Sequence, residues 1–131
     1  MSKMEELKLF KQAKELCSYI LVITESSPKK YRYTLVARLQ QLSLDVLENF
    51  FLANDVYVDK ENKASTYRLR RNYQNIALAR LKMLTFTAEL SMKRQAILPK
   101  QFERISKLAS ECQTLLGGWI LSDRKQFDVR K

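Results

Sequence analysis

The sequence contains no histidine, and only two glycines, two prolines and two cysteines occur among its 131 residues. Without histidine the chain lacks the usual general base and the commonest metal ligand. Sheets need turns rich in Gly, Pro, Asn and Asp, so the scarcity of glycine and proline favours long helices with few connections. No glycine-rich phosphate loop and no paired-carboxylate motif is visible either.

The remaining reactive side chains do not form a recognisable catalytic or metal-binding group. Asp55, Asp59 and Glu61 cluster in a polar connection, where a solvated loop is the simpler interpretation. Two isolated cysteines cannot make a zinc site of the usual spacing. Cys17 and Cys112 lie on apolar helical faces, so we interpret both as core residues with free thiols in a reducing compartment. We expect no catalysis, no cofactor, no metal and no small-molecule substrate.

Long apolar runs are also missing. No stretch approaches the ~20 residues that span a bilayer, and the first residues, MSKMEELKLFKQ, lack the apolar core of a signal peptide. We therefore expect a cytoplasmic protein without a membrane partner. A hydrophobic content of 46% with 29% charged residues is typical of one globular domain.

Apolar residues recur at helical spacing in four long stretches. These stretches cover about residues 3–25, 30–54 and 65–95, and the fourth begins at Pro99, a residue favoured in the first helical turn. The sequence predicts an all-α protein, an up-down-up-down four-helix bundle. We place the bundle domain at residues 1–121 and a basic, flexible tail at 122–131.

The apolar stripes identify the expected core. In the third segment the predicted core side consists of Leu69, Tyr73, Ile76, Ala77, Leu84 and Ala88. In the fourth, the residues Phe102, Ile105, Ala109, Cys112, Leu116 and Trp119 recur at gaps of three and four. Gly117 and Gly118 fall near its end, and either close approach of a neighbouring backbone or a frayed terminus would account for them.

The second segment carries two apolar stripes, although packing against one core requires only one. The main stripe runs from Leu35 to Ala53 and faces the core. The second, about 100° away, contains Leu44, Leu47 and Phe51. Either this helix is deeply buried at the centre of the bundle, or the second stripe forms a subunit interface, since apolar surface left exposed usually marks a contact. We predict an oligomer interface at these three residues.

Positive charge is concentrated in the third segment. Residues 66–96 carry seven cations against the single acid Glu89, a net +6 from a chain total of +10, whereas residues 1–27 are neutral. Such uneven charge creates a positive field over one region and suits a polyanion, most commonly nucleic acid. A solvated face on a basic protein is the simpler alternative.

Three of these cations share one narrow helical stripe. Arg68, Arg71 and Lys82 alternate there with an amide and a small residue, so phosphates can approach closely. Arg80 instead points towards the core side and must snorkel, find a carboxylate or carbonyl partner, or lie at a subunit boundary. The full set of predicted nucleic-acid-binding residues is Arg68, Arg70, Arg71, Arg80, Lys82, Lys93 and Arg94.

Three segments carry a family resemblance. The runs KYRYTLVARLQQLSLDVLENFFLAND, ALARLKMLTF and LLGGWI, spread over about residues 31–120, resemble the accessory variability determinant (Avd) family of diversity-generating retroelements. The most specific element is the run from Leu116 to Ile120, and Lys82 also matches the family pattern. A related branch, the four-helix protein of intervening sequences in ribosomal RNA genes, shows two motifs that the second segment here lacks. The retroelement branch is therefore favoured.

The resemblance implies a four-helix bundle assembled as a barrel-shaped homopentamer. It also implies binding to a reverse transcriptase and to its template RNA or cDNA, without catalysis by the accessory subunit. The alternative is a structural oligomer or adaptor of the ribosomal-RNA intervening-sequence type, whose basic face meets an acidic protein. The residues alone support polyanion binding and self-association; the reverse transcriptase and the five-fold count come from the resemblance.

Overall fold

A computed structural model describes residues 2–128 of the chain, and within this range the regular structure is entirely helical. The long helices are α1 (Lys3–Ile23), α2 (Ala37–Asp55), α3 (Lys63–Lys93) and α4 (Pro99–Phe127). Short helical turns at Thr24–Ser26, Lys29–Tyr31 and Arg32–Val36 join α1 to α2. The bounds agree with the four apolar stretches of the sequence to within a few residues at most ends, and the all-helical prediction is confirmed.

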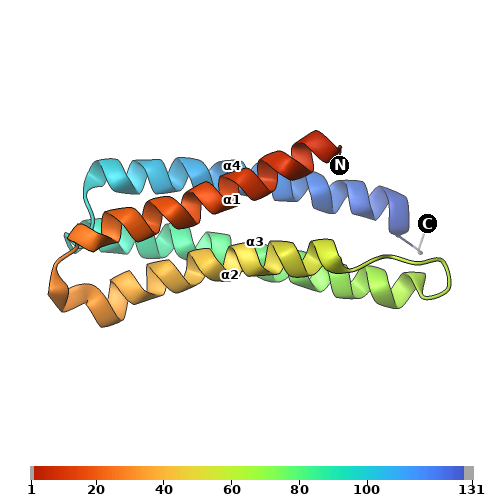
Figure 1. Cartoon of the computed structure of the whole chain (residues 1–131), viewed down its shortest axis with the longest axis horizontal. Coiled ribbons are helices and arrows are strands. Elements are labelled where there is room, and N and C mark those ends of the chain that lie inside the picture. Colours follow the sequence, from red (N-terminus) through yellow and green to blue (C-terminus); the bar gives the residue numbers. More distant parts are fainter. Residues whose placement is uncertain (1, 129–131) are drawn as a thin grey trace.

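The four helices run alternately up and down (Figure 1). Each packs against its neighbours in the chain, and α1 closes the bundle against α4. The α1–α2 and α3–α4 connections lie together at one end, and the longer α2–α3 loop lies at the other (Figure 1). This topology presents α3 between α2 and α4, so one side of its long surface remains open to solvent.

The connections contain no glycine, because both glycines of the chain lie within α4. Pro28 follows the end of α1 and cannot continue a helix. After α3, Gln95 adopts a φ of 65°, and the amides of Gln95 and Ala96 bond back to the carbonyls of Met92 and Ser91. This pattern of bonds stops a helix and usually has glycine at the left-handed position. A glutamine therefore occupies this left-handed position, and the amino-acid sequence does not predict the turn.

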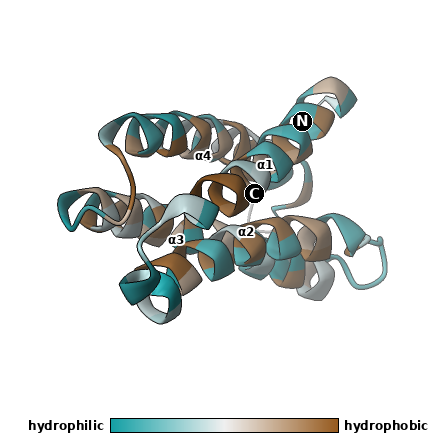
Figure 2. Cartoon of the chain, turned by 60° about the vertical axis from the view of Figure 1, so that its left-hand side comes forward, coloured by the Kyte–Doolittle hydropathy of each residue, from teal (hydrophilic) through white to brown (hydrophobic). Residues whose placement is uncertain are grey.

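The core is one continuous apolar cluster to which all four helices contribute. Leu9, Leu16, Phe50, Leu84 and Ile105 are each completely buried. The predicted core stripes of α2 and α4 lie almost entirely inside. Apolar and polar stretches alternate along each helix ribbon (Figure 2). Some large apolar side chains remain exposed, and most of these lie on α1, α2 and α3.

The predicted core side of α3 is partly wrong. Leu69 and Ile76 are 45% and 38% exposed, whereas the buried line contains Gln74, Ala77, Leu81, Leu84 and Ala88. Helix α3 carries two interleaved apolar stripes, one buried and one exposed, and the predicted core side took residues from both. The core selects the stripe that begins with polar Gln74, because this rotation buries Leu81 together with Leu84 and Ala88.

The C-terminal part of the bundle extends beyond the predicted boundary at residue 121. Helix α4 continues to Phe127, and Asp123 within it is buried. Residues 129–131 of the predicted tail lie outside the described range. Gly117 and Gly118 sit in mid-helix, exposed, and a Cβ at either would meet nothing within 4 Å. Fraying is therefore excluded, and no backbone within residues 2–128 makes the close approach that was the other explanation.

The register of α3 is testable with two substitutions. Leu81→Ala should lower the free energy of unfolding by about 2–5 kcal/mol, because it opens a cavity in the core. Ile76→Ala, one of the exposed stripe, should cost less than about 1 kcal/mol in a monomeric sample. Urea unfolding followed by circular dichroism measures both. Equal losses would show that α3 is rotated differently.

Candidate nucleic-acid interface

The predicted basic stripe lies on the outer face of α3. Arg68 and Lys82 are exposed and Arg71 is half-buried, and neither Arg68 nor Lys82 makes an ion pair within residues 2–128. The Arg71 Nε donates to the Asn75 side-chain oxygen at 3.1 Å, which holds the guanidinium along the helix. One Arg71 terminal nitrogen is buried and has no hydrogen-bond partner in the described chain. Arg68 and Lys82 thus present their charge fully to a ligand, whereas Arg71 presents only the exposed part of its guanidinium.

Lys93 and Arg94 lie at the other end of α3. The helical rise places Arg68 and Lys93 about 38 Å apart along the axis. Lys93 pairs with Glu89 at 3.1 Å, but this pair is largely solvent-exposed and weak. Arg94 caps the helix, and its carbonyl accepts a hydrogen bond from the Tyr31 hydroxyl at 2.7 Å. A ligand touching both ends must therefore be long.

Arg80 has the carboxylate partner that its position required. Its Nε lies 3.6 Å from an Asp45 oxygen on α2, and the arginine side chain is 42% exposed. The pair sits where α2 and α3 meet, so Arg80 snorkels to the surface with its charge partly neutralised. It contributes less to a phosphate surface than Arg68 or Lys82.

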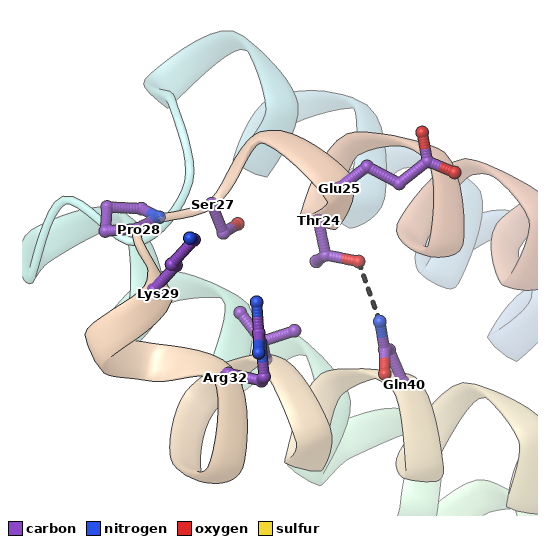
Figure 3. Close-up of a pocket in the computed structure, with 8 residues that line it drawn as sticks. Thr24, Glu25, Ser27, Pro28, Lys29, Arg32 and Gln40 are labelled. Carbon is purple, nitrogen blue, oxygen red and sulfur yellow. Dashed lines mark hydrogen bonds between the residues drawn. The ribbon is translucent and has the colours of Figure 1, made fainter.

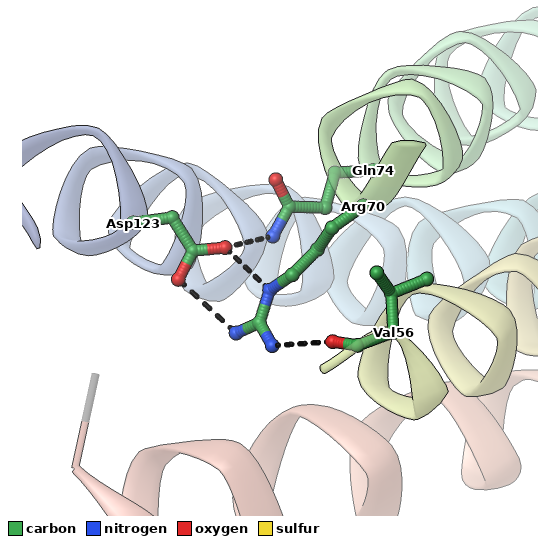
Figure 4. Close-up of polar contacts among 4 residues, drawn as sticks. All are labelled: Val56, Arg70, Gln74 and Asp123. Atoms are coloured by element: carbon green, nitrogen blue, oxygen red, sulfur yellow. Dashed lines mark hydrogen bonds and ion pairs between the residues drawn. The ribbon is translucent and has the colours of Figure 1, made fainter. Parts of the chain in front are cut away.

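Arg70 is committed to an interaction inside the bundle (Figure 4). Its Nε lies 2.7 Å from one oxygen of Asp123 on α4, and a terminal nitrogen donates to the other at 3.1 Å. Gln74 donates to the same carboxylate at 2.8 Å. The guanidinium also lies 5.1 Å from the Trp119 ring centre. With its side chain 17% exposed, Arg70 is not available to a phosphate, contrary to its place in the predicted set.

The sequence contains a pattern from which the Arg70–Asp123 ion pair could have been predicted. Arg70 precedes Gln74 and Ala77 on the core stripe of α3 by four and seven residues, and Asp123 follows Trp119 on that of α4. Because the two helices are antiparallel neighbours, a cation at the start of one core stripe meets an anion at the end of the other. The other terminal nitrogen of Arg70 donates to the Val56 carbonyl at 3.4 Å and so contacts the α2–α3 loop.

Three cations that the sequence analysis missed lie on the α1–α2 connection. Lys29, Lys30 and Arg32 form the run KKYR directly after Pro28. The Tyr31–Arg94 hydrogen bond joins this connection to the end of α3. The basic surface therefore continues from α3 onto the end of the bundle, and the compact run of cations after proline was the available signal.

The predicted interface residues of α2 are only partly covered. Leu44 and Phe51 are 44% and 45% exposed, whereas Leu47 packs against the core. The Phe51 ring lies 5.1 Å from that of Phe10 on α1, and Lys14 lies over it. Of the two readings of this stripe, deep burial within the chain is therefore excluded.

Besides the exposed apolar residues of α2, the chain has an exposed apolar line on α3. It is made by Leu69, Ile76, Met83, Phe86 and Leu90. Four of these residues recur at intervals of seven, so they lie along one side of the helix. The line flanks the basic stripe. Together with Leu44 and Phe51, it gives the chain two separate apolar faces on different helices.

Both cysteines are buried and unpaired. The Cys17 thiol donates to the Ser43 carbonyl at 3.0 Å, and burial raises its pKa. Burial, with a smaller effect of the Glu111 charge, raises the pKa of Cys112 to about 12. Both thiols stay protonated at neutral pH, and a protonated thiol is a poor nucleophile and metal ligand.

Two further absences hold for residues 2–128. No group of three or more histidine, cysteine or acidic side chains is arranged to hold a metal ion. None of the described helices has the length and apolar character that crossing a membrane requires.

The comparisons with known proteins identify the fold. No protein-family model matches the sequence, and no curated protein matches it. Among solved structures, the chain is similar to a protein of unknown function from the S23 ribosomal protein family of Bacteroides thetaiotaomicron VPI-5482. The TM-score is 0.73 at 17% identity, over 88% of this chain and 97% of the other. This similarity supports a four-helix arrangement of that type and shows the fold alone.

Mutations should distinguish the structural role of Arg70 from that of its neighbour Arg71, which we expect to contribute little to stability. Asp123→Asn leaves Arg70 without its counter-charge in a mostly buried position, so it should lower the free energy of unfolding by about 3 kcal/mol. Arg71→Gln should change stability by less than about 0.5 kcal/mol. Chemical denaturation of both variants gives the comparison. A neutral effect of Asp123→Asn would contradict the buried ion pair.

Proposed function

We propose that this protein is a non-catalytic, nucleic-acid-binding accessory subunit, and that it serves the reverse transcriptase of a diversity-generating retroelement. One observation carries the nucleic-acid part: Arg68, Arg71 and Lys82 occupy one outward face of α3 without an acidic partner among the described residues. Exposed cations along a helix attract phosphates and release their counter-ions on binding.

The geometry of this surface suits backbone contact rather than base readout. The cations follow a helix about 46 Å long, with Asn75 and Ala79 as small, uncharged neighbours on the same stripe. Of the aromatic residues beside the stripe, Tyr67 and Tyr73 are partly buried, whereas Phe86 is 57% exposed. Tyr67 lies against Phe127, with ring centres 6.2 Å apart. Because phosphate contacts carry no base information and stacking on an exposed ring accepts any base, we expect binding that tolerates many sequences.

The proposal that the partner is a retroelement reverse transcriptase does not rest on the basic stripe of α3. The segments LLGGWI and ALARLKMLTF resemble the retroelement accessory family, and the solved neighbour is named as a member of a ribosomal protein family. Both contexts involve RNA, which agrees with the basic face. The reverse transcriptase as partner, and RNA or cDNA as ligand, follow from the resemblance.

Self-association is the second part of the proposal. One apolar face, at Leu44 and Phe51, borders α1, and the other is the exposed line on α3. Two different faces on one chain fit a head-to-tail contact, which closes into a ring when the rotation permits. Covering a side chain such as Leu44 or Phe51 contributes roughly 1 kcal/mol here, because each is already half-buried. The resemblance supplies the number five.

A ring would also strengthen binding to nucleic acid. Each copy contributes one basic α3 face, and several faces around one axis act on the same long polyanion. The second and later contacts are then intramolecular and have a high effective concentration. A modest affinity of each copy for nucleic acid is therefore sufficient for tight binding by the whole ring.

The basic stripe is tested by a triple substitution. Arg68→Gln, Arg71→Gln and Lys82→Gln together should weaken binding to a mixed-sequence RNA and reduce the slope of log K against log salt by about two to three. The matched control is Lys3→Gln, Lys8→Gln and Lys11→Gln on α1, which removes equal charge from exposed positions. Fluorescence anisotropy at several salt concentrations provides the slopes. An unchanged slope in the α3 variant, or an equal fall in the control, would refute the assignment; tight binding to an acidic protein instead would favour the adaptor alternative.

The interface is tested by charge insertion on either face. Leu44→Lys with Phe51→Lys, and separately Ile76→Lys with Phe86→Lys, should each dissociate the assembly into monomers and weaken RNA binding through lost avidity. Tyr57→Lys, at a loop residue that is 81% exposed, is the control and should leave the mass unchanged. Native mass spectrometry gives the masses. A monomeric wild type at micromolar concentration, or an assembly that survives both pairs, would contradict this part.

A further inference from the structure

A pocket opens where α1 ends and α2 begins (Figure 3). Its volume is about 300 Å³, and its wall includes Thr24, Ser27, Lys29, Arg32 and Gln40. This size is at the lower end of those that take small ligands. It lies at the end of the bundle opposite the α2–α3 loop, on different elements from the basic stripe of α3 (Figure 1).

Two cations supply the charge of the pocket. Lys29 and Arg32 are exposed and make no ion pair with any described residue. Their side chains extend into the space between Ser27 and Gln40, while the Glu25 carboxylate, the acid of this wall, is directed away from them (Figure 3). The pocket therefore carries two cations against one carboxylate that is directed away from them, and its net charge is positive.

A polar atom in the wall also lacks a partner. The Ser27 hydroxyl oxygen is buried and forms no hydrogen bond with the described chain. Buried hydroxyls are almost always paired with protein, water or a ligand. Beside it, the Thr24 hydroxyl donates to the Ile20 carbonyl at 2.6 Å and accepts from the Gln40 amide at 3.0 Å. The second N–H of that amide remains for a ligand.

The backbone is irregular at this point. The residues Lys29–Tyr31 form a tight 3₁₀ turn, and Arg32–Val36 form a wide π-helical turn before α2 becomes regular. Single π turns occur frequently at functional sites. Here the wide turn begins at Arg32, so the irregular geometry sets the direction of the arginine that lines the pocket.

We propose that this pocket binds a phosphate group, carried either by the end of a nucleic-acid strand or by a free phosphorylated small molecule. A terminal phosphate carries close to two negative charges, which match Lys29 and Arg32. Its several oxygens accept from an arginine fork, an ammonium and a hydroxyl approaching from different directions. The site is additional to the α3 stripe, and it stands or falls independently of the proposed function.

The experiment compares one single-stranded oligonucleotide with a 5′-phosphate and with a 5′-hydroxyl, together with titration of inorganic phosphate. The wild type should prefer the phosphorylated strand by about tenfold, roughly one charge-assisted contact. Lys29→Gln with Arg32→Gln should remove this preference, and Ser27→Ala should reduce it. Lys30→Gln with Arg38→Gln removes equal charge from exposed positions nearby and should keep the preference, as should the triple variant of α3. Circular dichroism confirms folding of each.

The outcomes separate the two sources of phosphate. Preference for the phosphorylated strand, competed by inorganic phosphate, assigns the pocket to strand ends. Binding of inorganic phosphate that is lost in the Lys29/Arg32 variant, without strand preference, assigns it to a free phosphorylated molecule. If wild type shows neither, or if the Lys30/Arg38 control loses as much as the pocket variant, the proposal is overturned. Ser27→Ala, a small change at a wall residue, keeps the test valid if the double variant fails to fold.

Discussion

The rotation of α3 about its own axis determines what the rest of the molecule can present. Leu81, Leu84 and Ala88 pack into the shared core, and the Arg70–Asp123 pair fixes the start of the same line against α4. With these contacts in place, Arg68 and Lys82 must face solvent. A rotation of one residue, about 100°, would bury a different stripe and move the cations. The core packing thus positions the charged surface, although no cationic side chain of that surface belongs to the core.

The rotation of α3 is also the part of the fold that the sequence predicted least well. Helix positions and topology follow from apolar spacing and from the few turn residues, because long periodic segments give a strong signal. The register of α3 did not follow, since Leu69 and Ile76 are as apolar as Leu81 and only packing against α2 and α4 selects between the lines. Arg70 was misassigned for a related reason: charge alone does not reveal that Asp123, 53 residues later in the chain, lies beside it. The 3₁₀ and π turns around Arg32 carry no local signature.

Exposed apolar and basic residues share the surface of α3, so the proposed assembly and the proposed nucleic-acid binding would use the same helix. Ile76, Met83 and Phe86 lie beside Lys82 on the same helix. Burying the apolar line between subunits would bring the cations of each copy to the edge of a contact, where the surrounding dielectric is lower and attraction to phosphate is stronger. Gly117 and Gly118 on α4, which cost helix stability without a contact inside the chain, are also compatible with a close neighbour in such an assembly.

Mapping the contact directly is the sharpest test of the central claim that the outward face of α3 meets nucleic acid. Mixed-sequence RNA carrying a photoreactive nucleotide can be cross-linked to the wild-type protein, and the modified peptides identified by mass spectrometry. The account predicts adducts concentrated within residues 65–95, on the side of Arg68, Arg71 and Lys82. Efficient cross-linking confined to α1 and the α2–α3 loop, with none on α3, would contradict it.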